Sequence, residues 1–576
     1  MPKKTAVATE ALEQQKLYET SLQAGELQEY RLFGSPGTGK TTTMSRQIVN
    51  AVNKHGSDQV MIASFTRTAA AELAGRNLPI PKENIATLHA HAYRAMGRPS
   101  LIDASKWNQD VSKVKNDWQL STAPRESMID EPDMATTTGR TQGDILLSKY
   151  DLLRAKMLPI EAAYDEELRA FAERYEAFKK ETATIDFTDM IALALENIDA
   201  VPSAPTVGFF DEVQDFTPLE LALVRKWGKN MQYVVLAGDD DQTLFSFKGA
   251  TPNAFLEPEL ADSFIRVLPQ SYRVPRSVHT EAVRLVEQLS KRQYKEYMPR
   301  FEMTGYDEKT RRRTYDESRI AEGLVTRRRY NFADWSYCDA MVQEALENEK
   351  NGKTTMFLAA CNYQTETLKN VLRRNGAMFH NPYRTTNGGW NPLGKDGTIK
   401  RILAFMSAYT HEQQTWQVGS FLAWAEIVKA SNVFKRGILA QLKKQDENAE
   451  IPYNEMLALF NNNDNAMAAI NADLRWLMTN AKTAYEKRIA YIIKVIDRYG
   501  MEHLRNERPK IVLGTIHSVK GGEADHVFLS PDLSPQGYED YLINPDNAIR
   551  QYYVGMTRAF EQLHIVSPSG NQYVKL

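Results

Sequence analysis

Cysteine is nearly absent from this sequence. Only Cys338 and Cys361 occur among 576 residues, far apart and without Cys-x-x-Cys spacing. Two such residues exclude a disulfide framework and a zinc site built on cysteine pairs, and they are typical of a reducing compartment. No apolar run approaches the roughly 20 residues that span a membrane, and Met1 to Glu19 lack the apolar core of a secretory signal. We therefore expect a soluble, cytoplasmic protein without a membrane partner.

An excess of charge of either sign is also missing. The chain has 71 basic and 73 acidic residues, which gives a formal net charge of −2. This balance excludes attraction of nucleic acid by the whole surface, so binding of that kind would need a local groove. A length of 576 residues is too great for one hydrophobic core, and we expect about three or four structural domains.

Short apolar runs rich in β-forming residues alternate with helical segments, a pattern typical of α/β domains with parallel sheets. One group of runs lies at 30–33, 60–65, 207–210 and 232–237, and a second at 356–360, 510–514, 526–529 and 563–566. Residues 93–184 contain a helical run from Ile160 to Lys180. Residues 396–507 are mostly helical, with a 3.6-residue apolar period from Leu474 to Ile496 and Gly500 as the expected cap. The sequence predicts two α/β cores, each interrupted by a mainly helical insertion.

The segment after the first apolar run has the spacing of a phosphate-binding loop. It reads Gly34-Ser35-Pro36-Gly37-Thr38-Gly39-Lys40-Thr41, and a helical pattern follows from Thr42 to Val52. Glycines let the backbone wrap around phosphate oxygens, and the start of the helix supplies unpaired N–H groups and a positive dipole end. We expect Lys40 to hold the β- and γ-phosphates of a nucleoside triphosphate and Thr41 to ligate Mg²⁺. Thr42 is counted with the nucleotide-binding residues.

Two carboxylates follow a later apolar run, Phe209-Phe210-Asp211-Glu212. At the carboxyl end of a strand near the loop, Asp211 can hold Mg²⁺ through water, and Glu212 can orient and deprotonate an attacking water. A polar strand end without a function is the alternative for an isolated acidic pair. The residues that follow, Val213-Gln214-Asp215 and the run from Gly238 to Ala250, favour the catalytic interpretation.

The ordered set of motifs resembles the superfamily 1A helicases of the UvrD/Rep/PcrA kind, over nearly the whole chain. Besides 34–41 and 211–215, the similar stretches are Ser64–Ala70, Thr87–His89, Ile185–Asp189, Gly238–Ala250, Gln270–Arg273, Thr515–Glu523 and Tyr553–Ala559. The resemblance implies two RecA-like P-loop NTPase cores with parallel sheets. It implies a first core at 1–92 and 185–266 with an insertion at 93–184. The second core would lie at 267–395 and 508–576, with an insertion at 396–507.

The resemblance also implies roles around a bound ATP and Mg²⁺. Arg273 and Arg558, both in the second core, look like the arginine fingers that stabilise charge developing on the γ-phosphate. Gln242 resembles the γ-phosphate sensor, Tyr272 would stack on the adenine, and Glu523 would contact the ribose. The catalytic set that this implies is Lys40, Asp211, Glu212, Gln242, Arg273 and Arg558, with Thr41 and Asp211 at the metal.

Aromatic side chains near these motifs are the expected contacts to single-stranded DNA. Base–aromatic stacking supplies about 1–3 kcal/mol per base without sequence preference. The positions where the family has such rings are Phe65, Phe187, Phe245 and Phe247. Core packing is the alternative, and for Phe187 and Phe245 the two interpretations are evenly balanced. Contacts to the DNA backbone or between domains are expected from Thr87, His89, Lys248 and His517.

Several positions depart from the family pattern. Thr42 stands where Arg is usual, and Phe247-Lys248 replaces Trp-Arg, so the forked contact of Arg is lost. Ala548 replaces an expected acidic residue, and 434–438 only partly match a duplex-contacting turn in an insertion that looks shortened. These departures affect grip on duplex DNA more than movement along a single strand.

The resemblance leads to two main hypotheses. The first is an ATP-driven single-stranded-DNA translocase and 3′–5′ DNA helicase. It would act as a monomer on single strands and on single-strand/duplex junctions, with replication or repair proteins as partners. The second is a DNA- or nucleotide-sensing regulatory ATPase of a repair or defence complex, without productive unwinding. An RNA-directed motor is a third interpretation.

Overall fold

The computed structural model describes residues 28–65, 73, 75–76, 78–122, 141–163, 165–307, 312–384, 391–393, 398–406, 415–500 and 508–576. Thr66–Ala70 of one motif and the N-terminal stretch Met1–Glu19 lie outside the described residues. The chain forms two compact units. Unit 1 comprises residues 1–326, 533–563 and 572–576, and unit 2 comprises residues 327–532 and 564–571. This division keeps 267–326 and 533–563 with the first sheet, and the domain borders drawn from the motifs stay a prediction.

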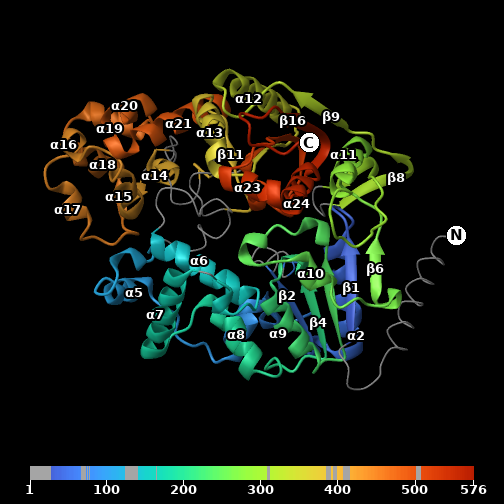
Figure 1. Cartoon of the computed structure of the whole chain (residues 1–576). Coiled ribbons are helices and arrows are strands. Elements are labelled where there is room, and N and C mark those ends of the chain that lie inside the picture. Colours follow the sequence, from blue (N-terminus) through green and yellow to red (C-terminus); the bar gives the residue numbers. More distant parts are fainter. Residues whose placement is uncertain are drawn as a thin grey trace. The chain divides into compact units, whose positions relative to one another are not determined.

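Unit 1 is built on a six-stranded sheet (Figure 1). Its strands are β1 (Glu29–Gly34), β2 (Val60–Ser64), β3 (Ile85–Thr87), β4 (Val207–Asp211), β5 (Tyr233–Gly238) and β6 (Ile265–Leu268). The spatial order is β3-β2-β4-β5-β1-β6, and every neighbouring pair is parallel. Parallel pairing brings the carboxyl ends of β1, β4 and β5 to one edge of the sheet, the edge where such sheets bind ligands.

The four central strands of this sheet, β2, β4, β5 and β1, are buried on both faces. Successive side chains of a strand point to opposite faces, and here both sets are apolar. Phe33 and Phe210 belong to one hydrophobic cluster, whereas Leu32 and Phe209 belong to the other. Burial of both faces is typical of parallel sheets that helices cover on either side.

The helices that follow these strands are α2 (Lys40–His55), α4 (Leu88–Ala95), α8 (Phe187–Asn197), α9 (Pro218–Gly228) and α10 (Pro252–Leu256). The start of α8 is a capping box of Asp186 with Asp189, and the start of α9 is a capping box of Thr217 with Glu220. Each box satisfies two backbone groups that would otherwise lack a partner in the first turn. α8 therefore begins inside the motif Ile185–Asp189, and α9 begins three residues after Asp215, the last residue of its motif.

The first insertion consists of α5 (Ala104–Val111), α6 (Gln142–Ala155) and α7 (Glu166–Thr182). The predicted helical run from Ile160 is interrupted, because α7 begins only after the cap Asp165. Arg154 on α6 and Lys179 on α7 both pair with Asp186, at 2.7 and 3.1 Å. These largely buried ion pairs connect the insertion to the N-cap residue of α8.

The rest of unit 1 comes from segments far apart in the sequence. Its elements are α11 (Arg276–Val286), β7 (Phe301–Asp307), β8 (Arg312–Ile320), α23 (Pro535–Ile543) and α24 (Asp546–Met556). β7 and β8 form a separate antiparallel hairpin. The border between the units passes through β9 (Leu324–Arg328) and β16 (Ala559–Val566).

A second six-stranded sheet has the order β11-β14-β10-β15-β16-β9. Its remaining strands are β10 (Thr355–Ala359), β11 (Phe379–His380), β14 (Ile511–Thr515) and β15 (Ala524–Leu529). β10 pairs in parallel with β14 and β15, and β11 pairs in parallel with β14. The helices α12 (Trp335–Lys350) and α13 (Glu366–Arg374) contribute to its hydrophobic core.

The second insertion is helical apart from a two-stranded sheet. Its elements are α14 (Thr398–Phe405), β12 (Thr415–Gln417), α15 (Val418–Ala425), α16 (Ala430–Val433), α17 (Ile438–Leu442), β13 (Glu450–Pro452), α18 (Tyr453–Leu459), α19 (Asn463–Ile470), α20 (Leu474–Asn480) and α21 (Thr483–Tyr499). The apolar period from Leu474 belongs to two helices, because Ala481 pairs with Val428 and Lys482 N–H donates to Ile427 O at 2.9 Å. Gly500 ends α21 as predicted, with a φ of 81°.

The fold class predicted from the sequence is confirmed. The chain is a mixed α/β protein with two six-stranded sheets and the parallel pairing expected of RecA-like cores. Within the described ranges, no helix is both long and apolar enough to cross a membrane.

Candidate functional site

The phosphate-binding loop connects β1 to α2 in unit 1. Gly37 and Gly39 have φ values of 77° and 78°, in the left-handed region that favours glycine. A Cβ on Gly34 would collide with the Thr38 hydroxyl, and a Cβ on Gly37 would lie 2.5 Å from the Cβ of Arg273. The glycines therefore permit both a tight turn and the close approach of a distant segment.

Lys40 begins α2, and its ammonium lies against the loop. Nζ donates to the Gly34 carbonyl oxygen at 2.5 Å, and Thr38 Oγ1 closes the turn on Ser35 O at 2.8 Å. A Cβ on Gly39 would meet no atom of the described residues within 4 Å. The loop thus has an open concave side at the start of a helix, where backbone N–H groups favour an anion. This geometry fits a triphosphate.

Asp211 and Glu212 lie at the carboxyl end of β4, which β5 separates from β1. Asp211 is 2% exposed, and its Oδ1 accepts a hydrogen bond from the Glu212 N–H at 3.0 Å. Glu212 has a φ of 57°, a strained value for a residue other than glycine and one that clusters at functional sites. The Asp211 carboxylate and the Thr41 hydroxyl are oxygen donors. This small donor set fits Mg²⁺, which usually keeps water and phosphate oxygens as further ligands.

Hydrogen bonds connect Glu212 to Arg558 through three intermediate residues. Gln214 Nε2 donates to Glu212 Oε2 at 2.6 Å, and Gln214 Oε1 accepts from the Asp239 N–H at 3.0 Å. Gln242 Nε2 donates to Asp239 Oδ2 at 2.6 Å, and Arg558 Nη2 donates to Gln242 Oε1 at 3.1 Å. Arg558 is 1% exposed. The expected base, sensor and arginine finger therefore share one continuous polar network.

A buried ionic cluster supports this network. The ammonium of Lys295 lies 3.2, 2.5 and 3.0 Å from the carboxylates of Asp239, Asp240 and Asp241, and all four side chains are 0% exposed. Arg292 also pairs with Asp241 at 2.5 Å. Each carboxylate in such a site needs a cation close by, because an unpaired buried charge is strongly destabilising.

The cluster separates the pKa values of its carboxyl groups. Burial, with repulsion from Asp240 and Asp239, raises the pKa of Asp241 to about 6 in spite of the nearby Lys295. Burial also acts on Asp239, but Lys295 and Lys40 outweigh it and hold the pKa of Asp239 below its ordinary value. Asp239 therefore stays ionised and accepts the hydrogen bond that orients Gln242.

The segment around Tyr272 is attached to the outer backbone of the phosphate loop. Ser271 Oγ and Tyr297 OH donate to Pro36 O at 2.9 and 3.0 Å, and the Tyr272 N–H donates to Gly37 O at 2.8 Å. Arg273 is next in the chain. The Tyr272 ring is 44% exposed and is thus accessible for stacking.

Lys40, Gln242, Arg273 and Arg558 therefore converge in unit 1. Sequence reasoning missed several residues of this site, among them Gln214 and Lys295. Gln214 lies inside a recognised motif, so its amide could have been considered. Lys295 follows a polar stretch without a motif, and nothing local indicates that it meets three carboxylates.

Phe65, Phe245 and Phe247 form an aromatic patch with Lys248. The ring centroids of Phe65 and Phe245 lie 5.0 Å apart, and those of Phe245 and Phe247 lie 5.8 Å apart. Lys248 Nζ lies 4.8 to 5.9 Å from all three ring centroids. Phe65, Phe247 and Lys248 are partly exposed, whereas Phe245 is 2% exposed. In this arrangement Phe245 packs beneath the other two rings.

Thr87, His89 and Phe187 lie on neighbouring elements of the same unit. Thr87 caps α4 by accepting from the Ala90 N–H at 3.2 Å. His89 lies 3.5 Å from Glu220, and its ring lies 6.3 Å from that of Phe187. Phe187 is 48% exposed at the start of α8, so its ring is accessible.

Glu523 and His517 belong to unit 2. His517 lies two residues after the end of β14 and is 3% exposed, and Glu523 directly precedes β15. Their expected contacts to DNA and ribose stay predictions.

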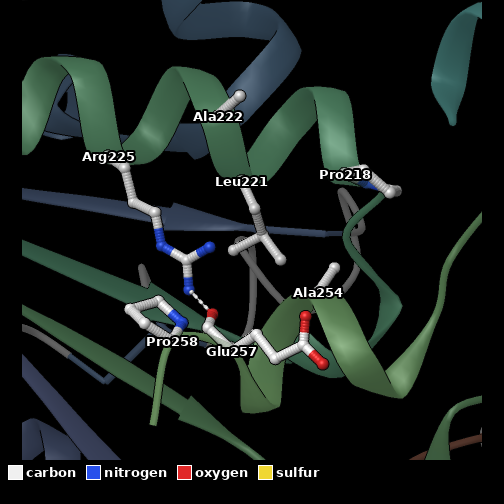
Figure 2. A pocket seen from close by; sticks show the side chains of 7 residues that line it. All are labelled: Pro218, Leu221, Ala222, Arg225, Ala254, Glu257 and Pro258. Atoms are coloured by element: carbon white, nitrogen blue, oxygen red, sulfur yellow. Dashed lines mark hydrogen bonds between the residues drawn. The ribbon is translucent and has the colours of Figure 1, made fainter. Parts of the chain in front are cut away.

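A separate shallow cavity of about 350 Å³ lies between α9 and α10 (Figure 2). Arg225 extends along it, donates to Glu257 O at 2.6 Å and pairs with Glu29 at 2.9 Å. Figure 2 shows Leu221 and Ala254 on its wall. None of the expected site residues lines this cavity.

Comparison with known proteins agrees with the motif order. Residues 17–260 match the UvrD/REP helicase N-terminal domain, and residues 510–566 match the UvrD-like helicase C-terminal domain. The chain is 24% identical over 247 residues to a putative ATP-dependent DNA helicase, YjcD, of Bacillus subtilis, covering 39% of this chain and 32% of that protein. It is 25% identical over 279 residues to the ATP-dependent DNA helicase PcrA of Leuconostoc citreum, covering 43% and 35%.

A third relative is the ATP-dependent DNA helicase UvrD2 of Mycobacterium tuberculosis. The identity is 27% over 294 residues, which is 44% of this chain and 41% of that protein. The matches thus span about a third to two-fifths of the length of these curated relatives. The two matched domains, in the order of the motifs, identify the chain as a member of the UvrD/REP helicase family.

Proposed function

We propose that this protein is an ATP-driven single-stranded-DNA translocase and 3′–5′ DNA helicase. The observation that carries the proposal is the hydrogen-bonded network from Glu212 through Gln242 to Arg558, beside the phosphate-binding loop. A nucleotide-binding loop alone would serve many ATPases. A sensor glutamine joined to both an acidic motif and a buried arginine is what a motor needs to couple nucleotide state to movement.

In the proposed reaction, Lys40 would hold the β- and γ-phosphates. Thr41 and Asp211 would hold Mg²⁺, which would neutralise charge on the phosphates. Glu212 orients the attacking water and accepts its proton. Arg273 and Arg558 stabilise the charge that develops on the transferred group, a contribution of about 10³- to 10⁵-fold for such residues.

Tyr272 and Glu523 are proposed to bind the adenosine moiety. Two observations support stacking of Tyr272 on the base. Its ring is exposed, and its backbone N–H donates to Gly37 O, which keeps the residue beside the phosphate loop. Glu523 is assigned to the ribose by its motif alone.

On the DNA side, Phe65 and Phe247 are proposed to stack on successive bases, with Phe245 supporting both rings from below. Lys248 would meet the phosphate backbone, since its ammonium lies over the same three rings. The remaining proposed contacts are Thr87, His89, Phe187 and His517. Phe245, Phe247 and Lys248 of this patch follow Gln242 by only a few residues, so a shift of the sensor would reach the bases through a short segment.

The 3′–5′ direction rests on two motifs that resemble the 1A group, Gly238–Gln242 and Thr557–Ala559. The matched relatives carry the name ATP-dependent DNA helicase, which supports DNA as the substrate. Action as a monomer at single-strand/duplex junctions, with replication or repair partners, completes the proposal.

The test has two arms. ATP turnover is measured without nucleic acid, with single-stranded DNA and with RNA of the same sequence, and Lys40→Ala serves as the inactive control. Unwinding is measured on duplexes with a 3′ or a 5′ single-stranded tail. We expect strong stimulation by DNA and unwinding from the 3′ tail only. Turnover that ignores DNA would favour a sensing ATPase instead, and unwinding from the 5′ tail would reverse the polarity.

A further inference from the structure

The hairpin β7–β8 lies outside both large sheets. The residue at its base, however, contacts the segments that carry Arg273 and Arg558. Much of the hairpin is exposed, and its strands pair with each other in a two-stranded sheet. Arg300, the residue before β7, is in contrast only 5% exposed. A buried guanidinium at the base of an exposed hairpin needs a structural reason, because burying its charge is costly without hydrogen bonds.

Arg300 joins the segment of Arg273 to the segment of Arg558. Its Nε donates to Arg273 O at 3.1 Å, and its Nη2 donates to Phe560 O at 2.9 Å. Its guanidinium also lies 4.0 Å from the centroid of the Phe560 ring. Phe560 comes two residues after Arg558 in the chain. One rigid planar group thus sets the spacing of two backbone segments that each carry an expected arginine finger.

The strand β8 adds two contacts of the same kind. Arg313 places its guanidinium 4.2 Å from the Phe560 centroid. Tyr315 OH donates to Tyr272 O at 2.9 Å, and the rings of Tyr315 and Tyr272 lie 5.5 Å apart. The backbone of Tyr272 therefore contacts the hairpin through its carbonyl oxygen and the phosphate loop through its N–H.

The exit of the hairpin passes the same two segments at close range. Gly323 has a φ of 65°, and a Cβ at this position would collide with Pro275 and lie 2.9 Å from Glu561 O. Pro275 and Glu561 flank the segments that Arg300 joins. Arg300 before β7, the strand β8 and Gly323 after β8 thus all lie against the two segments that carry Arg273 and Arg558.

We propose that the β7–β8 hairpin is a brace, with Arg300 as its positioning residue, that holds Arg273 and Arg558 in register with the phosphate loop. The proposal rests on the proposed function for its catalytic consequence, although the brace itself is a statement about two chain segments. Arg300 acts through the backbone of both segments and does not touch the phosphates. Its loss should therefore lower the rate of hydrolysis more than the affinity for nucleotide.

The first experiment measures amide hydrogen exchange in the full-length protein, in peptides that cover 270–275 and 555–561. Arg300→Ala should increase exchange in both peptides together, because one side chain links them. Arg319→Ala is the matched control, since Arg319 is on β8, is 68% exposed and pairs only with Glu302 among the recorded ion pairs of the described residues. Unchanged exchange in either peptide, or the same increase in the control, overturns the brace.

The second experiment measures ATP turnover with single-stranded DNA, together with the affinity for a fluorescent ATP analogue. Arg300→Ala should lower kcat by about 10- to 100-fold, since a misplacement near 1 Å costs on that order, with affinity changed less than about threefold. Low millimolar guanidinium should restore part of kcat, because the ion can replace the missing hydrogen bonds to Arg273 O and Phe560 O. Loss of affinity in parallel with kcat, without rescue, contradicts the positioning role.

Two conservative variants keep the test informative if Arg300→Ala does not fold. Arg300→Lys keeps the charge but loses the fork, and should behave like a milder form of Arg300→Ala. Tyr315→Phe removes one hydroxyl and should raise KM for ATP by about 2- to 10-fold with little change in kcat. If the wild-type protein lacks turnover, the proposed function fails, while hydrogen exchange still decides whether the brace exists.

Discussion

Replacing Lys295 by methionine is the sharpest perturbation of the buried ionic cluster. The ammonium of Lys295 has no exposed surface and lies within 3.2 Å of the carboxylates of Asp239, Asp240 and Asp241. Methionine has nearly the same length and is apolar, so it fills the space but removes the charge. Arg292 still faces Asp241, but the acidic triplet loses the only cation recorded in contact with all three carboxylates among the described residues.

Removing one partner of a buried ion pair typically costs about 3–5 kcal/mol, because the other charge stays buried without compensation. A loss of 1 kcal/mol lowers the thermal midpoint of a large domain by roughly 2 °C. We therefore expect Lys295→Met to lower the midpoint by about 6–10 °C. The loss should grow from pH 6 to pH 8, because Asp241, whose pKa is already raised to about 6, can relieve the repulsion by binding a proton at the lower pH.

Thermal unfolding of the wild type, Lys295→Met, Asp241→Asn and the double variant provides the assay. Asp241→Asn removes one of the uncompensated charges, so the double variant should be more stable than the sum of the two single losses predicts. The matched control is Lys291→Met, because Lys291 is on the same segment but is 51% exposed and pairs with an exposed Glu257. Additive losses at Asp241 and Lys295, or an equal loss in the control, would refute the reasoning.

The remaining predictions concern the reaction, the DNA patch and pH. Glu212→Gln should abolish turnover but still bind ATP, because the amide cannot accept the proton of the attacking water; normal hydrolysis in a single-turnover assay would remove Glu212 from this role. Phe247→Ala should uncouple unwinding from ATP turnover through the loss of a stacking ring, and unchanged unwinding per ATP would show that the ring only packs. Burial lowers the pKa of His91 from 6.5 to about 4, in spite of its contact with Ile62 O. Since the folded pKa is depressed, the unfolded chain binds the extra proton, and folding should lose about 3 kcal/mol as the pH falls from 6.5 to 4. Urea unfolding of His91→Gln should show a flatter pH dependence, and an identical slope would contradict this.

Features that depend on local sequence were predicted successfully. The phosphate loop is recognised from eight neighbouring residues, and the apolar patterns on either side of it predict its strand and its helix. β4 and β5 are predicted from continuous apolar runs. Weak or polar strands were missed, such as β3 with three residues and β8 with an Arg-rich sequence. The break at Ala481 was missed because apolar periodicity continues across it, while a backbone pairing with Val428 decides the conformation.

The candidate site divides in the same way. Motif residues could be assigned individually, because each motif has its own spacing. The partners that hold them could not, since Lys295 meets the acidic triplet from more than fifty residues away and Arg300 bridges segments about 290 residues apart, which only the fold brings together. Gln214 is an intermediate case between these two groups. It lies inside a motif, but only the fold shows that its amide bonds to both Glu212 and Asp239.

ATP turnover of Arg558→Ala on saturating single-stranded DNA, measured beside its affinity for a fluorescent ATP analogue, tests the central claim most directly. Arg558 reaches Gln242 at 3.1 Å from a segment more than 300 residues away, and we propose that it stabilises the charge on the transferred phosphoryl group. The expected result is a fall in kcat of about 10³-fold or more with nearly unchanged affinity. Retained turnover, or a loss confined to affinity, would contradict the account.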